Sequence, residues 1–367
     1  MPTTISDFML HARELAVRGH GFVEPNPMVG CVLVNNQNKI VGTGYHEKCG
    51  EAHAEINALN AAGSLAKGAT AYVTLEPCNH QGKTGPCSQA LIDAGISKVV
   101  IGCADLNLEA SGGGAYLANN GVEVVFVDDE LCKTILAPFL HRIRTGFPWV
   151  ICKWAQTSDG YIETPEGEDP WISCEASQQL VHEERGRVDA IIVGIGTVVA
   201  DNPSLTVRHS TAHRTPLRVI VDPTLRLPHN SIVLDGEVPT LIAHGKDANL
   251  NELKDRAVSF LELPNKDGAL DLRPLMSHLV NEYDATNVIV EGGRTMFEHV
   301  FNQHLANELW VFTSQRTIGD QKLANMKSLF DSLDCTLEYK HKSGDDSVCH
   351  FFVDCKNNSS TSPVSAE

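Results

Sequence analysis

The stretch Ala52-His-Ala-Glu-Ile-Asn-Ala-Leu-Asn-Ala-Ala62, followed by Thr70-Ala-Tyr-Val-Thr-Leu75, decides the fold of the first half of the chain. The first segment predicts a helix and the second predicts a buried strand. A further helix is expected at 87–94, closed by Gly95, and a further strand at 97–103. Because helices and strands alternate from residue 52 onward, we expect an α/β fold with a partly parallel sheet covered by helices.

Three more elements complete this half. A helix is expected at 6–18, and another at 129–143. Between them, Val29-Gly-Cys-Val-Leu-Val34 and Ile40-Val-Gly-Thr-Gly-Tyr45 predict a hairpin, because polar turn residues separate the two apolar runs.

The second half predicts another α/β layer with its own core. Strands are expected at 149–154, 189–193, 217–222, 239–243, 257–262, 287–290 and 308–313, and helices at 174–186, 270–283 and 294–303. A chain of 367 residues is too long for one ordinary core, so two domains are expected. We place them at 1–145 and 146–355, followed by a frayed tail at 356–367, which is rich in Asn, Ser, Thr and Pro.

The composition is that of a globular protein, with 42% hydrophobic and 20% charged residues. The net charge of −17 argues against broad affinity for nucleic acid, although it leaves room for a local phosphate pocket. No apolar run is long enough to cross a bilayer, and the first residues do not form a secretory signal. Eleven scattered cysteines in such a chain predict reduced thiols and a cytoplasmic location.

His53, Glu55, Cys78 and Cys87 are the residues that carry chemistry in the first half. One imidazole and two thiols can hold a zinc ion and leave its fourth position to water. A carboxylate two residues after the histidine is well placed to move the proton of that water. The combination is typical of zinc-dependent hydrolytic deaminases, in which a glutamate acts as general acid and base.

The expected positions of these residues support this interpretation. His53 and Glu55 lie in the first turn of the helix at 52–62, and Cys87 begins the next helix, where a thiol pKa is lowered. Cys78 follows the strand at 70–75, and Pro77 favours the first turn of a short helical segment.

Other interpretations of the cysteines remain open. Cys31 and Cys103 lie inside strand patterns and are expected to be small hydrophobic core residues. The generic deaminase pattern has two residues between its cysteines, whereas eight separate Cys78 and Cys87 here. A purely structural zinc site would need a fourth protein ligand, for which Cys49 and His80 are the nearby candidates.

Glycine-rich turns mark a second candidate site. Gly292 and Gly293 follow an apolar strand and open a helix, where free backbone N–H groups and the helix N-terminus suit a phosphate. Arg294 adds positive charge. Gly194 and Gly196 end another strand and permit close approach of a ligand. Taken alone, Gly292 and Gly293 are better explained by a plain tight turn, and a strand end with close helix packing explains Gly194 and Gly196 equally well.

The motifs taken together resemble a known family. Four segments are similar to the bifunctional riboflavin-biosynthesis deaminase/reductases, in which the wider cysteine spacing is usual: Glu24-Pro-Asn-Pro-Met-Val-Gly-Cys31, Gly44-Tyr-His46, His53-Ala-Glu55 and Thr74–Cys87. Lys153–Gly160 and Val193–Pro203 resemble the reductase half of that family. The resemblance covers roughly residues 5–355. It implies a cytidine-deaminase-like α/β/α domain followed by a dihydrofolate-reductase-like α/β domain.

The resemblance also implies roles for residues. His53, Cys78 and Cys87 would bind Zn²⁺, Glu55 would be the proton shuttle, and the reductase would use NADPH. The residues implied to bind the nucleotide are Ala155, Trp171, Thr197, Asp201, Gly292, Gly293, Arg294 and Thr295. Those implied to bind the substrate, a pyrimidine ribose phosphate, are Asn26, Asp169, Arg185, Leu205, Arg208 and Glu291.

This chain departs from the family at two places. Asp169 stands where a small serine is usual, and Asp105-Leu-Asn-Leu108 with the glycines that follow replaces an Asp-Pro-Asn-Pro-like segment. Arg185 and Arg208 have a physical reason to face substrate, because guanidinium groups bind phosphate bidentately. Lys153, a lone lysine in an apolar strand, is a weaker candidate for polarising the sugar or binding phosphate.

Two alternatives to a bifunctional enzyme stay open. One is a nucleoside, nucleotide or tRNA deaminase whose C-terminal half only binds, and the other is a non-catalytic, zinc-stabilised interaction protein. The resemblance further implies a homo-oligomer, either a dimer or a tetramer. No membrane and no nucleic-acid partner is expected.

Overall fold

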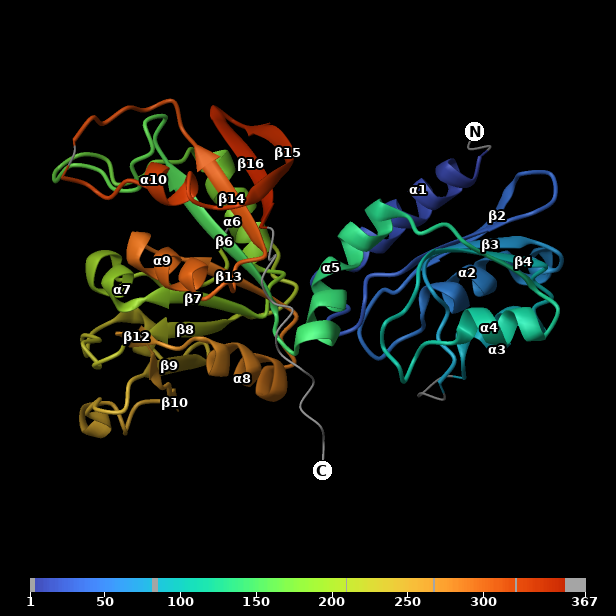
Figure 1. The fold of residues 1–367 in the computed structure, drawn as a ribbon, viewed down its shortest axis with the longest axis horizontal. Coiled ribbons are helices and arrows are strands. Elements are labelled where there is room, and N and C mark those ends of the chain that lie inside the picture. The colour runs from blue at the N-terminus through green and yellow to red at the C-terminus, as the bar shows by residue number, and fades with distance from the viewer. Residues whose placement is uncertain (1–3, 81–84, 209, 267, 321, 354–367) are drawn as a thin grey trace. The chain divides into compact units, whose positions relative to one another are not determined.

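The structure is a computed structural model that describes residues 4–80, 85–208, 210–266, 268–320 and 322–353 (Figure 1). The chain divides into two compact units, Met1–Phe147 and Pro148–Glu367, and each is described by itself. The tail predicted at 356–367 lies outside the described residues. Within the described ranges, no helix combines the length and the apolar character that a membrane span requires.

The first unit is built on a five-stranded sheet with the order β2-β1-β3-β4-β5. These strands are, in that order, Ile40–Tyr45, Gly30–Val34, Thr70–Leu75, Lys98–Cys103 and Glu123–Phe126. Strand β1 is antiparallel to both β2 and β3, whereas β3, β4 and β5 run parallel. The predicted hairpin and the partly parallel sheet are therefore confirmed.

Helices cover both faces of this sheet (Figure 1). They are α1 (Ile5–Ala16), α2 (Ala54–Ala62), α3 (Cys87–Asp93), α4 (Gly113–Asn119) and α5 (Glu130–Thr145). Helices α1 and α5 contact each other on one face, and α2, α3 and α4 pack together on the other. This is the α/β/α arrangement expected from the sequence.

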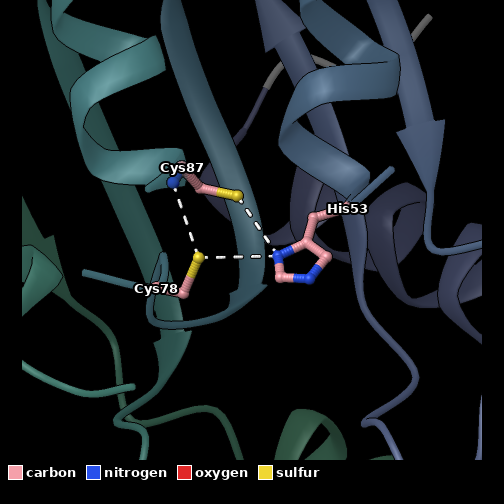
Figure 2. A group of neighbouring side chains, drawn as sticks. All are labelled: His53, Cys78 and Cys87. Atoms are coloured by element: carbon pink, nitrogen blue, oxygen red, sulfur yellow. Dashed lines mark hydrogen bonds between the residues drawn. The ribbon is translucent and has the colours of Figure 1, made fainter. Parts of the chain in front are cut away.

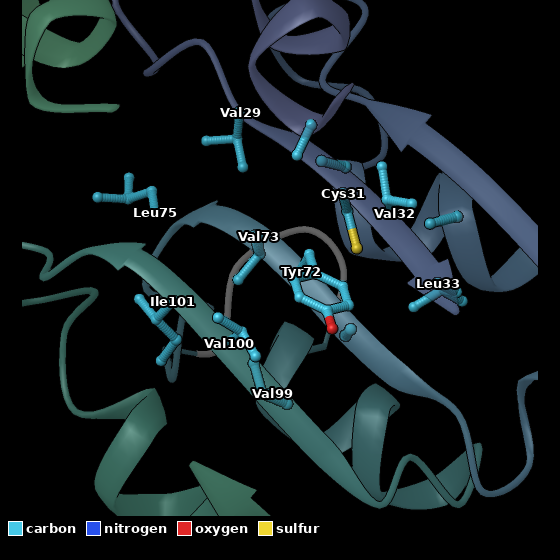
Figure 3. Close-up of a cluster of buried hydrophobic side chains, with 14 of the residues drawn as sticks. Val29, Cys31, Val32, Leu33, Tyr72, Val73, Leu75, Val99, Val100 and Ile101 are labelled. Atoms are coloured by element: carbon cyan, nitrogen blue, oxygen red, sulfur yellow. The ribbon is translucent and has the colours of Figure 1, made fainter. Parts of the chain in front are cut away.

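The core of this unit lies where β1, β3 and β4 meet the helices (Figure 3). Val32, Val73 and Val100 are fully buried there, as is Cys31, which confirms that this cysteine serves as a small core residue. A glycine brings α2 close to the sheet, because a Cβ on Gly44 would lie only 2.4 Å from the Ala54 carbonyl oxygen. This contact fixes the first turn of α2, where His53 and Glu55 lie.

The second unit is built on a nine-stranded sheet with the order β10-β9-β8-β7-β13-β6-β14-β16-β15. These strands are Ser259–Glu262, Thr240–His244, Leu217–Val221, Ala190–Gly194, Asn287–Glu291, Trp149–Gln156, Glu308–Thr313, Asp346–Val353 and Cys335–Ser343. All pairings from β10 to β14 are parallel, and β16 and β15 add an antiparallel hairpin. A separate two-stranded ribbon joins β11 (Asn265–Lys266) to β12 (Ala269–Leu270).

Helices accompany this sheet, and β7 packs against α7 and α9. The helices are α6 (Glu175–Arg185), α7 (Ile195–Asp201), α8 (Arg273–Tyr283), α9 (Arg294–Asn302) and α10 (Lys327–Phe330). Because β6, β7, β13 and β14 are parallel, the loops that leave them all emerge at the same edge of the sheet. Ligands of open parallel sheets bind at this edge.

Several local expectations need correction. Pro77 does not begin a helical turn, because the backbone around Cys78 bonds to other segments: Asn79 N–H donates to the Ala110 carbonyl and Ser88 N–H to that of Cys78. The sequence also did not predict α4, β5, α7 or the β15–β16 hairpin. Apart from the short helical segment at Pro77, the strands and helices that it did predict are present, with ends that shift by a few residues.

Candidate functional site

Three side chains from three separate segments converge in the first unit (Figure 2). His53 is the N-cap residue of α2, Cys78 lies in the loop after β3, and Cys87 is the first residue of α3. The His53 Nδ1 atom lies 3.5 Å from Cys78 Sγ and 3.4 Å from Cys87 Sγ. The donor atoms all lie within 4.8 Å of one another.

These donors fit zinc. Tetrahedral zinc with ordinary Zn–N and Zn–S bonds would separate an imidazole nitrogen from a thiolate by about 3.6 Å, close to the observed spacing. The hydrogen bond from Cys87 and a further one with His53 lower the pKa of Cys78, which favours the thiolate that a metal requires. Within the described part of the chain, neither Cys49 nor His80 joins the group, so the three donors leave a fourth position open.

Glu55 lies in the first turn of α2, and its carboxyl group interacts with the thiols of Cys78 and Cys87. The residue is only 3% exposed. Burial, and then the negative charge of Cys78, raise the pKa of Glu55 to about 7. A carboxyl group with a pKa near neutrality can both accept and donate a proton under ordinary conditions. The predicted position of Glu55 in the first turn of the helix is therefore confirmed.

Asn26 is held beside these residues by a histidine that sequence reasoning did not assign. The Asn26 Nδ2 atom lies 3.0 Å from His46 Nε2, and His46 Nδ1 lies 3.1 Å from the Ala52 carbonyl oxygen. His46 therefore donates from Nδ1 and accepts at Nε2, which fixes the orientation of the Asn26 amide. The His46 ring also meets the edge of the His53 ring, with centroids 5.3 Å apart. The Gly44-Tyr-His46 motif was the available signal for this role.

The altered loop at 105–114 packs directly on the loop that carries Cys78. Glu76 accepts hydrogen bonds from the backbone N–H groups of Asp105, at 3.2 Å, and Gly114, at 2.9 Å. A Cβ on Gly113 would lie 1.8 Å from the Pro77 carbonyl oxygen. The departure from the family pattern thus leaves a tightly packed loop that supports the cysteine.

The second unit brings the glycine-rich turns together. A Cβ on Gly292 would lie 3.4 Å from Thr197 Oγ1, so the start of α9 adjoins α7. No atom lies within 4 Å of the position that a Cβ would take on Gly196 or Gly293 among the residues that the structure describes. Open space above glycines at the carboxyl edge of a parallel sheet fits a nucleotide phosphate. The Arg294 guanidinium donates to the Glu298 carboxylate and to the Asn325 carbonyl.

Several predicted substrate residues also lie together. Arg185 Nε and Nη2 donate to the two carboxylate oxygens of Glu291, each at 2.7 Å. Burial opposes the ionisation of Glu291, but Arg185 outweighs it and lowers the pKa to about 2. The guanidinium expected to grip a phosphate is therefore paired with a carboxylate. Burial also lowers the pKa of Lys153, which lies near this pair.

Other predicted residues occupy loops at the same edge. Arg208 is exposed and donates to Ser204 Oγ at 2.9 Å, whereas Leu205 is buried with a positive φ of 50°. The Asp169 carboxylate accepts a hydrogen bond from Trp171 N–H at 3.0 Å. Asp169 thus supports its own turn, which resolves how an acidic residue is accommodated there. The remaining predicted nucleotide residues lie at the ends of β6, α7 and α9: Ala155, Asp201 and Thr295.

Comparisons with known proteins identify both halves. Residues 2–103 match the cytidine and deoxycytidylate deaminase zinc-binding region, and residues 148–349 match the RibD C-terminal domain. The chain is 37% identical over 352 residues to the riboflavin biosynthesis protein RibD of Aquifex aeolicus, covering 94% of this chain and 97% of that protein. The chain belongs to the RibD family. RibD of Escherichia coli is 37% identical over 328 residues, covering 85% of this chain and 88% of that protein.

Solved RibD structures share the fold. RibD of Acinetobacter baumannii, form 1, has a TM-score of 0.82 at 34% identity, covering 95% of this chain and 99% of that one. A diaminohydroxyphosphoribosylaminopyrimidine deaminase/5-amino-6-(5-phosphoribosylamino)uracil reductase from Thermotoga maritima gives 0.81 at 31% identity, covering 95% and 98%. The predicted family and fold class are confirmed. A passive C-terminal half is not favoured, because that half matches the RibD C-terminal domain.

Proposed function

We propose that this protein catalyses two successive steps of riboflavin biosynthesis. The first is the zinc-dependent hydrolytic deamination of 2,5-diamino-6-ribosylamino-4(3H)-pyrimidinone 5-phosphate. The second is the NADPH-dependent reduction of the ribosyl group to ribityl. The observation that carries this proposal is the convergence of His53, Cys78 and Cys87 beside the buried Glu55, in a chain that also has a RibD C-terminal domain.

In the deaminase site, His53, Cys78 and Cys87 would hold the metal, which supplies Lewis-acid activation of water when bound. Glu55 accepts a proton from the attacking water and delivers it to the ring nitrogen. It then takes the remaining proton from the hydroxyl group that has added to the ring carbon and passes it to the amino group, which leaves as ammonia while the carbonyl forms. Asn26, oriented by His46, presents its amide to the ribose or the base. Burial of Glu55 keeps bulk water away from this proton transfer.

In the reductase site, NADPH supplies the hydride when bound. We assign the nucleotide to Ala155, Trp171, Thr197, Asp201 and the turn at 292–295. The substrate is assigned to the remaining predicted residues of this half: Asp169, Arg185, Leu205, Arg208 and Glu291. The Arg185–Glu291 pair places one cation and one anion at the end of β13, where they can orient the sugar.

We further propose that the two activities belong to residues 1–145 and 146–355, that the enzyme works in the cytoplasm, and that it forms a dimer or a tetramer. The buried Cys31, Cys132 and Cys152 are free thiols, which suits a reducing compartment. The acidic net charge of −17 favours a small-molecule substrate over nucleic acid. Light scattering of the purified chain tests the oligomeric state.

The decisive experiment separates the two activities in one full-length chain. Glu55→Gln should abolish ammonia release from the pyrimidine phosphate while leaving its zinc content unchanged. The same variant should still oxidise NADPH when it is given substrate that has already been deaminated. Loss of both activities in a folded, zinc-loaded variant would contradict two separate sites, and unchanged ammonia release would contradict the role of Glu55.

A further inference from the structure

The loop that leaves β6 and the loop that leaves β14 meet at the carboxyl edge of the second sheet. The β6 strand pairs in parallel with β13 on one side and β14 on the other, so both loops emerge beside the glycine-rich turn at 292–293. The loop after β6 carries Asp169 and Trp171, and the loop after β14 carries Arg316. This arrangement places an arginine from one loop against the backbone of the other.

We propose that Arg316 is a positioning residue that holds the turn 168–171 in place, and so sets the affinity of the reductase site for NADPH. This inference rests on the proposed function, because it takes Trp171 as part of the nucleotide site. It assigns to Arg316 no contact with the nucleotide itself.

The Arg316 guanidinium spans the whole turn. Its Nη1 atom donates to the Asp169 carbonyl at 3.2 Å and to the Trp171 carbonyl at 2.9 Å. Its Nη2 atom forms an ion pair with Glu168 at 3.2 Å. The backbone of Arg316 is held in turn, since Ser158 donates to its carbonyl oxygen from both N–H, at 2.8 Å, and Oγ, at 3.0 Å.

The turn needs such support because it is exposed and few hydrogen bonds within it hold its backbone. Glu168, Asp169, Pro170 and Trp171 are all exposed, and the Trp171 indole is 57% exposed at the edge of the sheet. The turn's own bond from Trp171 N–H to Asp169 spans only two residues. An exposed aromatic ring offers a flat apolar surface to a ligand, but a mobile one would lose conformational entropy when the ligand binds. Holding the backbone in advance reduces that loss.

A second set of contacts links the same loops farther along the chain. The Asp159 carboxylate accepts hydrogen bonds from Ile318 N–H and Gly319 N–H, and Asn325 Nδ2 donates to the Asp159 carbonyl. The Asn325 carbonyl accepts from Arg294, at the start of α9. The loop after β6 is therefore tied at its base whether or not Arg316 is present. Removing Arg316 should loosen the 168–171 turn without releasing the whole loop.

Lysine cannot reproduce this role. A planar guanidinium presents several N–H donors in a fixed fork and can reach two carbonyls and a carboxylate together. A lysine ammonium would keep the charge and the attraction to Glu168, but it has a single donor centre. Arg316→Lys therefore separates the geometric contribution of the side chain from its charge.

The test compares full-length wild-type protein with Arg316→Ala and Arg316→Lys, with Arg256→Ala as the matched control. Arg256 lies in the same unit just before β10, the outermost strand on the side of the sheet away from β14. Its guanidinium also donates to a backbone carbonyl, that of His229. The dissociation constant for NADPH is measured without substrate. The KM for NADPH and kcat are then measured with deaminated substrate, and ammonia release serves as an internal control of the first unit.

We expect Arg316→Ala to raise both the NADPH dissociation constant and the KM for NADPH by about 5- to 50-fold, with kcat at saturating NADPH within about twofold of wild type. Arg316→Lys should fall between Arg316→Ala and wild type, and Arg256→Ala should match wild type. The KM for the sugar substrate should change less than the KM for NADPH.

Other outcomes would overturn the inference. Unchanged NADPH affinity in Arg316→Ala would do so. A lower kcat at constant KM in both Arg316 variants would also do so, because that result reports a smaller active fraction. If wild-type protein failed to bind NADPH at all, the proposed function itself would fall, and that result is distinguishable from both of these.

Discussion

Replacing Glu184 with glutamine should stabilise the second unit at pH 8 and leave its stability nearly unchanged at pH 4.5. Glu184 lies on α6 and is only 3% exposed. Burial, followed by repulsion from Glu308, raises its pKa to about 7, against the opposing attractions of Arg187 and His350. The Arg187 Nη1 atom lies 3.8 Å from the Glu184 carboxylate.

The sign and size of the effect follow from this shift. A carboxyl group whose pKa is higher in the folded state stabilises the fold at low pH, and that contribution is lost as the pH rises through the folded pKa. One pKa unit corresponds to about 1.4 kcal/mol, so a rise from 4.5 to about 7 makes the loss about 3 kcal/mol between pH 4.5 and pH 8. Glutamine stays neutral and should not show this loss.

The assay can be restricted to the second unit, because all four tryptophans of the chain lie there, at positions 149, 154, 171 and 310. Denaturant unfolding followed by tryptophan fluorescence at pH 4.5, 6, 7 and 8 gives the free energy of unfolding for wild type and Glu184→Gln. Glu183→Gln is the matched control, since it removes the same charge from the neighbouring, less buried position. The reasoning is refuted if Glu184→Gln and wild type lose stability with pH to the same extent.

Two further predictions concern the two sites. Gly44→Ala should lower both zinc content and ammonia release while sparing NADPH oxidation. The new Cβ would lie 2.4 Å from the Ala54 carbonyl oxygen and would displace the first turn of α2. Metal analysis of the purified variant measures the loss of zinc. Glu291→Gln should destabilise the second unit by about 3–5 kcal/mol, since it leaves the Arg185 charge without its partner. Tryptophan-monitored unfolding at pH 7 measures this loss of stability. A change below about 1 kcal/mol would contradict the prediction.

The deaminase residues could be predicted from the sequence because their signals are local. His53 and Glu55 lie two residues apart on one helix, and Cys87 lies at the start of another, so helix prediction alone places them near element ends. The loop around Cys78 could not be predicted in the same way. Its backbone hydrogen bonds go to Ala110 and Ser88, which lie in segments whose positions only the folded sheet determines.

The contacts of the reductase residues could not be predicted from local sequence patterns. Arg185 was expected to face a phosphate, but it pairs with Glu291, which lies 106 positions away. Asp169 stands where a small serine is usual in the family, and its carboxylate accepts a hydrogen bond within its own turn. Helix α7 was missed because it begins in a glycine-containing, β-branched sequence, Ile195-Gly-Thr-Val-Val199, that favours strand when it is judged without its packing against β7.

Metal content and ammonia release, measured on the same samples, test the account most directly. Protein stripped by a chelator and then titrated with zinc should regain ammonia release in proportion to bound zinc, up to one ion per chain. NADPH oxidation on deaminated substrate should persist throughout the titration. Full ammonia release by the metal-free protein would contradict the central claim that His53, Cys78 and Cys87 hold the ion on which the deamination depends.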